Sequence, residues 1–475
     1  MSRSCLTAVV FLILVFSAQS VSAQGSEYEL DEVLEMARAY APLLAEHDAR
    51  EDHARWQKYR AERAWWPSLQ AQSLLAPVPA EADPSRIDEN IDEILSLNLG
   101  PYFRQTARVT MPIYTFGRIS AAQELADVGV DVASLQRDAA IQDHLLRARQ
   151  AYHGRQLARA FEELLAEGDA LIKDTLEEME EDRAFGEADF STADLRRLQI
   201  FNAELDTMLL DNGRLKDLTE SALRYLTDTD EPMEVPALRP EDAELPIGGL
   251  ELYQEAAREN RPEIAQLQKA VEARRLQEDL SRREFYPNLF VAFDFGFGWS
   301  TEAPAFQRVC RRVEEGGPCV NSETLFTRPY ANPFDTLTFG VAVGLQWRFD
   351  FAQQYGRLQE SRARTTQTEA QEERALGAMR LEIEEAWRTT SDARARIDIE
   401  RRRFDTARRW RNQYGLQSDL RGGADMRDAL DPLRAYYEGR VGYLEAAHAY
   451  LAARAELARK VGVESLDEIE IGLGD

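Results

Sequence analysis

Residues 287–300 read PNLFVAFDFGFGWS and alternate large apolar side chains with small or polar ones. Every second residue from Leu289 to Trp299 is large and apolar, whereas Asp294, Gly296 and Gly298 lie between them. A period of two predicts a β-strand whose two faces meet different surroundings. A strand of a soluble sandwich has this pattern, and so does a strand with lipid on one side and water on the other. The stretch alone leaves both interpretations open.

Three further segments have the same alternation. In the segment of about residues 336–349, the odd-numbered residues are large and apolar, whereas Thr336, Thr338 and Gly340 fall on the other face. The segment of about residues 104–113 repeats the pattern, and that of about residues 68–77 is the least regular of the four. With a strand at about 288–299, all four are close to the length that a tilted transmembrane strand needs.

The sequence contains two copies of one pattern. Pro42 matches Pro262 and Pro67 matches Pro287 in similar surroundings, and both pairs share the same offset. Such self-similarity indicates an internal duplication. We therefore expect a first repeat over residues 24–245 and a second over 246–475, which meet in a proline- and acid-rich linker at about 231–249.

Each repeat is predicted to contain a helix, two strands, a long helix, a turn and a further helix. The long helices are expected at about 117–183 and 191–228 in the first repeat, and at about 356–419 and 426–462 in the second. A proline-free helix over 117–183 is roughly 100 Å long at 1.5 Å per residue. Apolar residues at spacings of three and four make a narrow seam, which is typical of a coiled coil or a helical array.

Residues 1–23 have the pattern of a secretory signal peptide. Arg3 precedes an apolar run at 6–17, and Val21-Ser22-Ala23 is a small-residue cleavage site. After this segment no apolar run reaches the roughly 18 residues of a transmembrane helix, so we expect any membrane span to be a β-barrel. The formal net charge of −27 excludes a nucleic-acid binder on electrostatic grounds.

The number of strands favours a barrel over a sandwich. Four strands make neither a thick core nor a closed barrel, for which about eight are needed, so more than one chain must contribute. Trp299 and Trp347 at strand ends resemble the aromatic girdles at lipid–water boundaries. A soluble sheet packed on the helices remains the alternative. On the barrel interpretation the lipid-facing residues are Leu289, Val291, Phe293, Phe295, Phe297, Leu337, Phe339, Val341, Val343 and Leu345.

The order of these features resembles the TolC-type outer-membrane efflux proteins over nearly the whole chain after the signal. The resemblance rests on the duplication, the proline before each odd strand, the junction PIYTFGR at 112–118 and the closing LEAAHAYLAARAELARKVG at 444–462. It implies long antiparallel helices that form a coiled-coil tunnel, and a homotrimer in which four strands per protomer build one twelve-stranded β-barrel. It also implies a bacterial outer-membrane location with a periplasmic helical portion that docks with partner proteins.

No catalytic constellation is visible, so the sequence predicts no enzyme, no cofactor and no metal site. His47 and His53 are six residues apart and fall on opposite helix faces, and His144 and His153 are no better placed. After the signal only Cys310 and Cys319 remain, in a stretch with glycines and a proline. In an oxidising compartment this pair is a candidate for a local disulfide.

The turns between the long helices carry the acidic candidates. Glu177, Glu178, Glu180, Glu181 and Asp182 precede the first turn. The residues that the family resemblance would place at the periplasmic entrance are Asp189, Asp194, Asp425 and Asp428. Three copies of such carboxylates would favour cations, although the same charges could simply solvate a helix end. Ser191 or Thr192 is expected to cap the following helix. The second turn has two glycine sites, so its entrance residues are placed only to within several positions.

The sequence therefore predicts a passive outer-membrane exit channel. It would take substrates from an inner-membrane pump or secretion transporter through a periplasmic adaptor, and the loops at about 77–100 and 300–332 would project outside the cell. Small-molecule efflux and type I protein secretion remain open. The alternative from another class is a soluble periplasmic coiled-coil scaffold.

Overall fold

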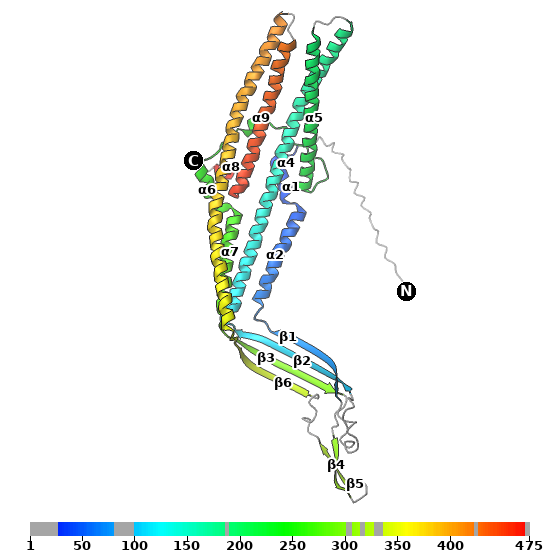
Figure 1. The fold of residues 1–475 in the computed structure, drawn as a ribbon, viewed down its shortest axis with the longest axis vertical. Coiled ribbons are helices and arrows are strands. Elements are labelled where there is room, and N and C mark those ends of the chain that lie inside the picture. Colours follow the sequence, from blue (N-terminus) through cyan, green and yellow to red (C-terminus); the bar gives the residue numbers. More distant parts are fainter. Residues whose placement is uncertain are drawn as a thin grey trace, which may run out of the picture. The chain divides into compact units, whose positions relative to one another are not determined.

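The computed structural model describes residues 27–79, 99–185, 190–300, 306–313, 319–326, 336–421 and 426–470 (Figure 1). The signal segment lies outside the described residues, so it stays a prediction. The chain divides into two compact units. The strand unit contains residues 45–138 and 262–379, and the helical unit contains residues 1–44, 139–261 and 380–475.

The strand unit holds a four-stranded antiparallel sheet. Its strands are β1 (Ser68–Pro79), β2 (Leu99–Tyr114), β3 (Asn288–Ser300) and β6 (Thr336–Gln346), and their order is β1-β2-β3-β6. Strands β2 and β3 come from different halves of the chain yet pair along nearly their whole length. Strands β1 and β6 are consequently the edges of the sheet.

Two further strands lie where the sequence predicted only a loop. Strand β4 (Phe306–Val313) pairs with β5 (Cys319–Phe326) in a separate two-stranded ladder. The loop prediction at 300–332 was therefore incomplete. The glycine–proline signal at 316–318 is compatible with one long loop, and a turn signal between two short segments is also typical of a hairpin.

Two shorter helices pack beside the starts of the long helices in the strand unit (Figure 1). Helix α2 (Ala41–Glu62) contacts α4 (Arg118–Phe185) through Lys58 Nζ and Asp127 Oδ1 at 2.8 Å. Helix α7 (Pro262–Arg283) contacts α8 (Phe351–Arg421) through Arg275 Nη2 and Glu369 Oε1, also at 2.8 Å.

The junction PIYTFGR depends on one glycine. Phe116 and Gly117 have φ of 53° and 77°, which reverse the chain between β2 and α4. Arg283 Nη1 donates a hydrogen bond to the Phe116 carbonyl at 2.9 Å, and a Cβ at Gly117 would lie 1.6 Å from that nitrogen. Gly117 is therefore required by its backbone conformation and by the guanidinium beside it.

The matching junction of the second repeat is built differently. Helix α8 begins at Phe351, earlier than the expected start at about 356, so Gly356 lies inside the helix. Strand β6 ends at Gln346, earlier than expected, and the Trp347 indole donates a hydrogen bond to the Phe285 carbonyl at 3.0 Å. The two halves thus share a sequence pattern but not one turn geometry.

The helical unit consists of helices packed along narrow apolar seams. It contains α1 (Leu30–Arg38), α5 (Thr192–Thr227), a 3₁₀ turn η2 (Pro240–Ala243), α6 (Leu250–Asn260), α9 (Met426–Val461), α10 (Asp467–Glu470) and the remaining lengths of α4 and α8. One seam joins α8 to α9 through Ile397, Ala447 and Tyr450, and another joins α4 to α5. Within the described ranges, no helix is both long and apolar enough to cross a membrane.

The linker between the halves is part of the core. Met233, Val235 and Leu238 are buried, and the Tyr450 hydroxyl donates a hydrogen bond to the Leu245 carbonyl at 2.8 Å. Apolar residues placed among the acids and prolines thus tie this segment to the helices, although its composition alone indicated only a connection.

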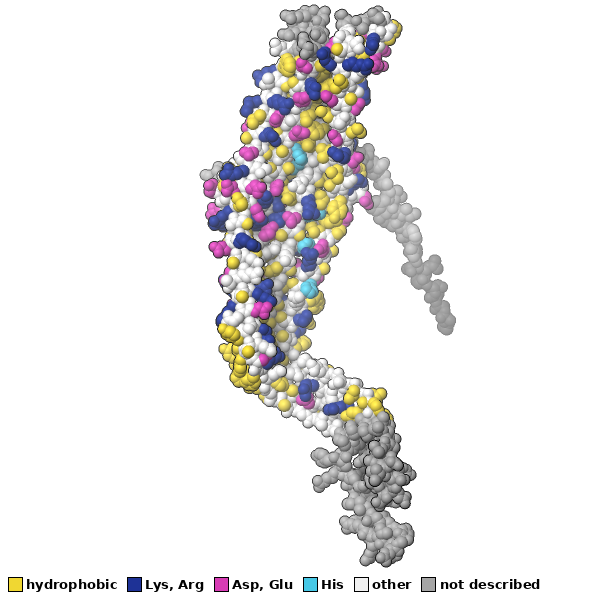
Figure 2. Space-filling model, viewed as in Figure 1, with side chains coloured by type: hydrophobic (Ala, Val, Ile, Leu, Met, Phe, Trp, Pro, Cys, Tyr) yellow, Lys and Arg dark blue, Asp and Glu magenta, His cyan; other side chains and the backbone are white. Residues whose placement is uncertain are grey.

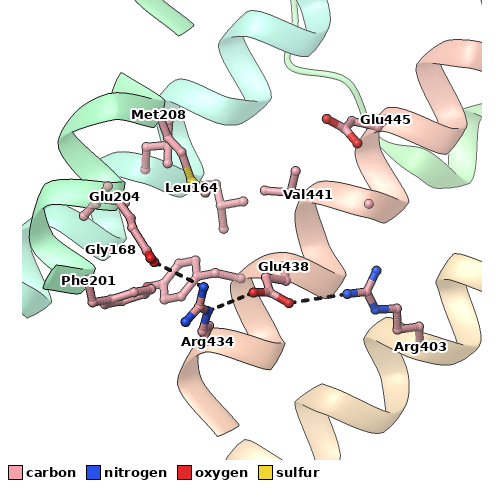
Figure 3. A pocket seen from close by; sticks show the side chains of 14 residues that line it. Leu164, Gly168, Phe201, Glu204, Met208, Arg403, Arg434, Glu438, Val441 and Glu445 are labelled. Atoms are coloured by element: carbon pink, nitrogen blue, oxygen red, sulfur yellow. Dashed lines mark hydrogen bonds and ion pairs between the residues drawn. The ribbon is translucent and has the colours of Figure 1, made fainter. Parts of the chain in front are cut away.

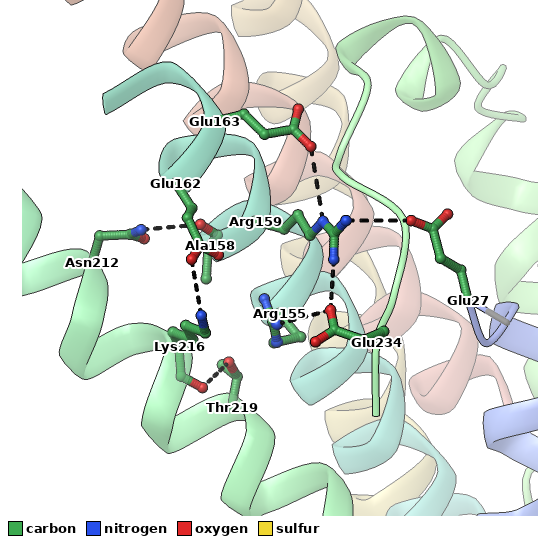
Figure 4. Close-up of polar contacts among 10 residues, drawn as sticks. All are labelled: Glu27, Arg155, Ala158, Arg159, Glu162, Glu163, Asn212, Lys216, Thr219 and Glu234. Atoms are coloured by element: carbon green, nitrogen blue, oxygen red, sulfur yellow. Dashed lines mark hydrogen bonds and ion pairs between the residues drawn. The ribbon is translucent and has the colours of Figure 1, made fainter. Parts of the chain in front are cut away.

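Polar contacts join the linker to α4 (Figure 4). Arg159 Nη1 lies 2.5 Å from Glu234 Oε2, and Arg155, whose side chain is almost fully buried, reaches the same oxygen at 3.4 Å. On the other side of α4, Asn212 Nδ2 of α5 donates to the Ala158 carbonyl at 3.1 Å. Because a buried guanidinium needs a charge partner, Glu234 helps to fix the linker on α4.

Candidate functional site

The large apolar residues of the sheet gather on one face. In the register of β3 and β6, the ten residues predicted to face lipid form five direct pairs, from Leu289 with Leu345 to Phe297 with Leu337. On β6 these side chains are 58–79% exposed, and Phe293, Phe295 and Phe297 of β3 are 40–44% exposed. Leu289 and Val291 are half-buried. The structure therefore brings all ten together, and their contact with lipid stays a proposal.

The opposite face is small and polar and carries every charged residue of the four strands. These residues are Arg104, Arg108 and Asp294. Arg108 and Asp294 are direct partners across β2 and β3 and form an ion pair between the Arg108 Nε and the Asp294 carboxylate. Gly344 on this face is covered by the Phe290 ring, since a Cβ there would lie 2.5 Å from Phe290 Cζ.

This arrangement differs from that of a soluble half-buried sheet. There, the large apolar face packs on a core and the polar face meets water. Here the large apolar face packs on no described core and is exposed, as are Arg104 and Arg108 on the polar face. A sheet with these two faces fits surroundings that are apolar on one side and aqueous on the other.

Exposed aromatic residues lie where the sheet of the strand unit meets its helices. Hydrophobic side chains gather at this end of the helices (Figure 2). Trp65 and Trp66 precede β1, and Trp347 and Phe349 follow β6, each at least 44% exposed. Amphipathic aromatic rings in this position are typical of a lipid–water boundary.

The structure places Asp194 in a helix cap. Ser191 is the N-cap of α5, and its hydroxyl accepts a hydrogen bond from the Asp194 amide at 3.3 Å, which confirms the expected cap. The Asp194 carboxylate accepts hydrogen bonds from the Ser191 hydroxyl and amide and from Arg197. These hydrogen bonds, above all that from the hydroxyl, lower the pKa of Asp194. The S-x-x-D spacing signals this reciprocal cap in the sequence, which the entrance prediction overlooked.

The other predicted entrance residues are described less fully. Asp189 and Asp425 lie outside the described residues, and Asp428 lies in α9 in a stretch whose side chains are not described. On the last turns of α4, Glu177, Glu178, Glu180 and Glu181 are exposed. An acidic surface therefore exists at this helix end, and its role as a channel entrance stays a prediction.

A cavity of about 260 Å³ lies between α4, α5, α8 and α9 in the helical unit (Figure 3). Arg434 of α9 contacts Glu204 of α5 at 3.3 Å and Glu438 at 2.9 Å, and Arg403 of α8 contacts Glu438 at 3.5 Å. This ion-pair network links α8 and α9 to α5. Sequence reasoning missed it because only the Arg434–Glu438 spacing is visible locally.

The histidines named in the sequence analysis make separate contacts and do not form a common cluster. His153 Nδ1 lies 3.0 Å from Gln156 Oε1, and burial lowers the pKa of His153 to about 4. His144 stacks on Tyr40 with ring centroids 4.8 Å apart, and His53 contacts Gln57. In the part of the chain that the structure describes, no group of three or more potential metal ligands occurs.

Cys310 and Cys319 lie on neighbouring strands of the small ladder. The backbone register pairs Cys310 with Ser322 and Val313 with Cys319. Their side chains are not described, so the disulfide stays a prediction.

The fold is shared with solved outer-membrane channels. CusC, whose crystal structures describe folding and transmembrane channel formation, matches with a TM-score of 0.70 and 12% identity over 92% of each chain. The Campylobacter jejuni CmeC outer membrane channel matches with a TM-score of 0.69 and 13% identity over 94% of this chain and 88% of CmeC. The open state of the Neisseria gonorrhoeae MtrE outer membrane channel matches with a TM-score of 0.69 and 17% identity over 92% of this chain and 89% of MtrE.

The likeness is one of structure rather than of sequence. No protein-family model matches this chain, and no curated protein matches it either. The fold expected from the TolC-type resemblance, mainly helical with a four-stranded sheet, is nevertheless confirmed.

Proposed function

We propose that this chain is an outer-membrane exit channel, a passive duct rather than an enzyme. The observation that carries the proposal is the sheet, whose large apolar face is exposed and whose charged residues all lie on the other face. In lipid every backbone polar group needs an internal partner, which a closed sheet provides. The fold shared with CusC, CmeC and MtrE supports the same role.

Closure requires further copies of the chain. Strands β1 and β6 are the edges of the sheet, and an unpaired edge cannot face lipid. Four strands are about half of the smallest closed barrel, so we propose a homotrimer with a twelve-stranded barrel. Strand β6 of one copy would then pair with β1 of the next.

The long helices are proposed to form a periplasmic tunnel with an acidic entrance. The exposed glutamates near the end of α4 support a negative potential there. Reversing the charges of Asp189, Asp425 and Asp428 should lower the cation selectivity of the channel, and unchanged selectivity would reject the entrance. Because reversal at Asp194 also removes a helix cap, Ser191→Ala is its matched control.

The partners are proposed from the fold. A periplasmic adaptor would join the helical end to an inner-membrane pump or to a type I secretion transporter, which supplies the energy. Efflux and secretion would differ in that transporter rather than in the duct.

Reconstitution tests the channel directly. The protein purified from the membrane fraction should have the mass of three chains in detergent and should produce discrete conductance steps in a planar lipid bilayer. A water-soluble monomer would instead support the periplasmic scaffold, and a trimer without conductance would also contradict the channel.

A further inference from the structure

The charges on the polar face of the sheet do not cancel. Arg108 and Asp294 are paired, as described above. Arg104, four residues before Arg108 on β2, is exposed, and among the described residues no acidic side chain pairs with it. Its direct partners in the register are Leu74 on β1 and Gly298 on β3, neither of which is charged. Among the residues that the structure describes, each chain therefore presents one guanidinium on this face that no acidic side chain offsets.

The surroundings of Arg104 leave room for a ligand. A hollow of about 730 Å³ on the sheet is lined by Arg104, Arg108, Asp294 and the polar residues Gln70, Gln72, Thr106, Thr336 and Thr338. Gly296 contributes no side chain to this hollow, and the Thr338 hydroxyl donates a hydrogen bond to its carbonyl at 3.4 Å. Arg104 thus borders an open hollow that hydroxyl and amide groups line.

We propose that Arg104 is a binding position for anionic groups of solutes that pass along the polar face of the sheet. A guanidinium presents five N–H donors in a fork that fits carboxylates and phosphates, and the neighbouring hydroxyls can donate further hydrogen bonds. Because Arg108 is paired with Asp294, its charge does not add to that of Arg104. The inference rests on the proposed function, because it requires the polar face to line a water-filled lumen.

In a trimer, three copies of Arg104 lie at one level of the lumen and raise the local concentration of anions. Screening at physiological salt acts over about 8 Å, so we expect each ring of charges to act mainly at its own level. Removing the three charges should lower the chloride-to-potassium permeability ratio about two- to fivefold. This effect is opposite in sign to that of acidic residues at the helical entrance.

The test is the reversal potential of the reconstituted channel in a potassium chloride gradient. Arg104→Gln is expected to shift selectivity toward potassium. Asp294→Asn releases Arg108 and is expected to shift it toward chloride. The double variant Arg108→Gln/Asp294→Asn removes a neutral pair and serves as the matched control, with the native reversal potential. Citrate, as an anionic probe, should reduce the current of the native channel more than that of Arg104→Gln.

The possible failures are distinguishable. If the native protein forms no conducting trimer, the proposed function fails. If it conducts but Arg104→Gln and Asp294→Asn leave both the reversal potential and the citrate effect unchanged, the channel stands and the anion site is overturned. Equal shifts in the double variant and in Arg104→Gln would likewise overturn it, because they would reflect altered sheet structure rather than charge.

Discussion

An arginine on the apolar face of the sheet should destabilise the protein strongly if that face meets lipid. Val341 is central in the 11-residue strand β6, pairs with Phe293 and is 58% exposed. An arginine at the bilayer midplane costs about 2–4 kcal/mol. The lost burial of the valine side chain adds about 1.5 kcal/mol. We therefore expect Val341→Arg to lower the free energy of unfolding by about 3.5–5.5 kcal/mol per chain.

The neighbouring residue provides the matched control. Gly340 lies on the polar face opposite Asp294, and a Cβ added there meets no atom within 4 Å. Gly340→Arg introduces the same side chain into the same strand, one position away. Because the arginine would point toward water, we expect a change below about 1 kcal/mol.

Urea unfolding in phospholipid vesicles, followed by tryptophan fluorescence, measures both changes. The account requires a large difference between the two variants. In a soluble sheet Val341 would be an exposed surface position, where substitution changes stability by only about 0.5 kcal/mol. Equal stabilities for Val341→Arg and Gly340→Arg would therefore refute the proposed orientation of the sheet.

Three further predictions concern the junction, the cap and the buried histidine. Gly117→Ala is strained at φ 77° and meets a guanidinium, so we expect it to lower the free energy of unfolding by about 1–3 kcal/mol, measured by thermal or urea unfolding. The control Gly213→Ala, in an open helical position, should stabilise the protein slightly. Equal effects of the two variants would contradict the role of Gly117. Ser191→Ala removes the N-cap of α5 and should lower the free energy of unfolding by about 1 kcal/mol, whereas an unchanged urea midpoint would contradict the cap. His153, with its pKa lowered to about 4, is neutral in the folded state, whereas the unfolded state takes up a proton below about pH 6.5. The contribution of neutral His153 to the free energy of unfolding is thus complete above pH 6.5. It is lost as the pH falls toward 4, and the loss is about 2 kcal/mol at pH 5. His153→Gln should flatten this slope, and an unchanged slope would refute the assignment.

Local patterns predicted most of the fold. The period of two identified four strands and assigned their side chains to faces, because a strand has only two faces and its side chains alternate between them. The long helices were predictable because they lack proline and carry apolar residues at threes and fours. The ladder of β4 and β5 was missed because two short segments beside a glycine–proline turn resemble one loop.

Tertiary contacts account for what the sequence did not predict. Arg434 and Glu204 are far apart in the chain, and only the packing of α9 on α5 brings them together. The buried linker likewise depends on surfaces of α4 and α9 that no local pattern describes. The spacing of Ser191 and Asp194 made the cap predictable, but the entrance prediction rested on the charge of Asp194 and not on its hydrogen bonds.

We propose that the apolar face of the sheet meets lipid and the polar face meets water. Nitroxide labels placed one at a time along residues 337–345, in a background with Cys310→Ser and Cys319→Ser, test it in reconstituted vesicles. The account predicts that labels at odd positions collide mainly with lipid-dissolved oxygen, and labels at even positions with a water-soluble nickel chelate. Labels at odd positions that meet the nickel chelate as freely as those at even positions would contradict it.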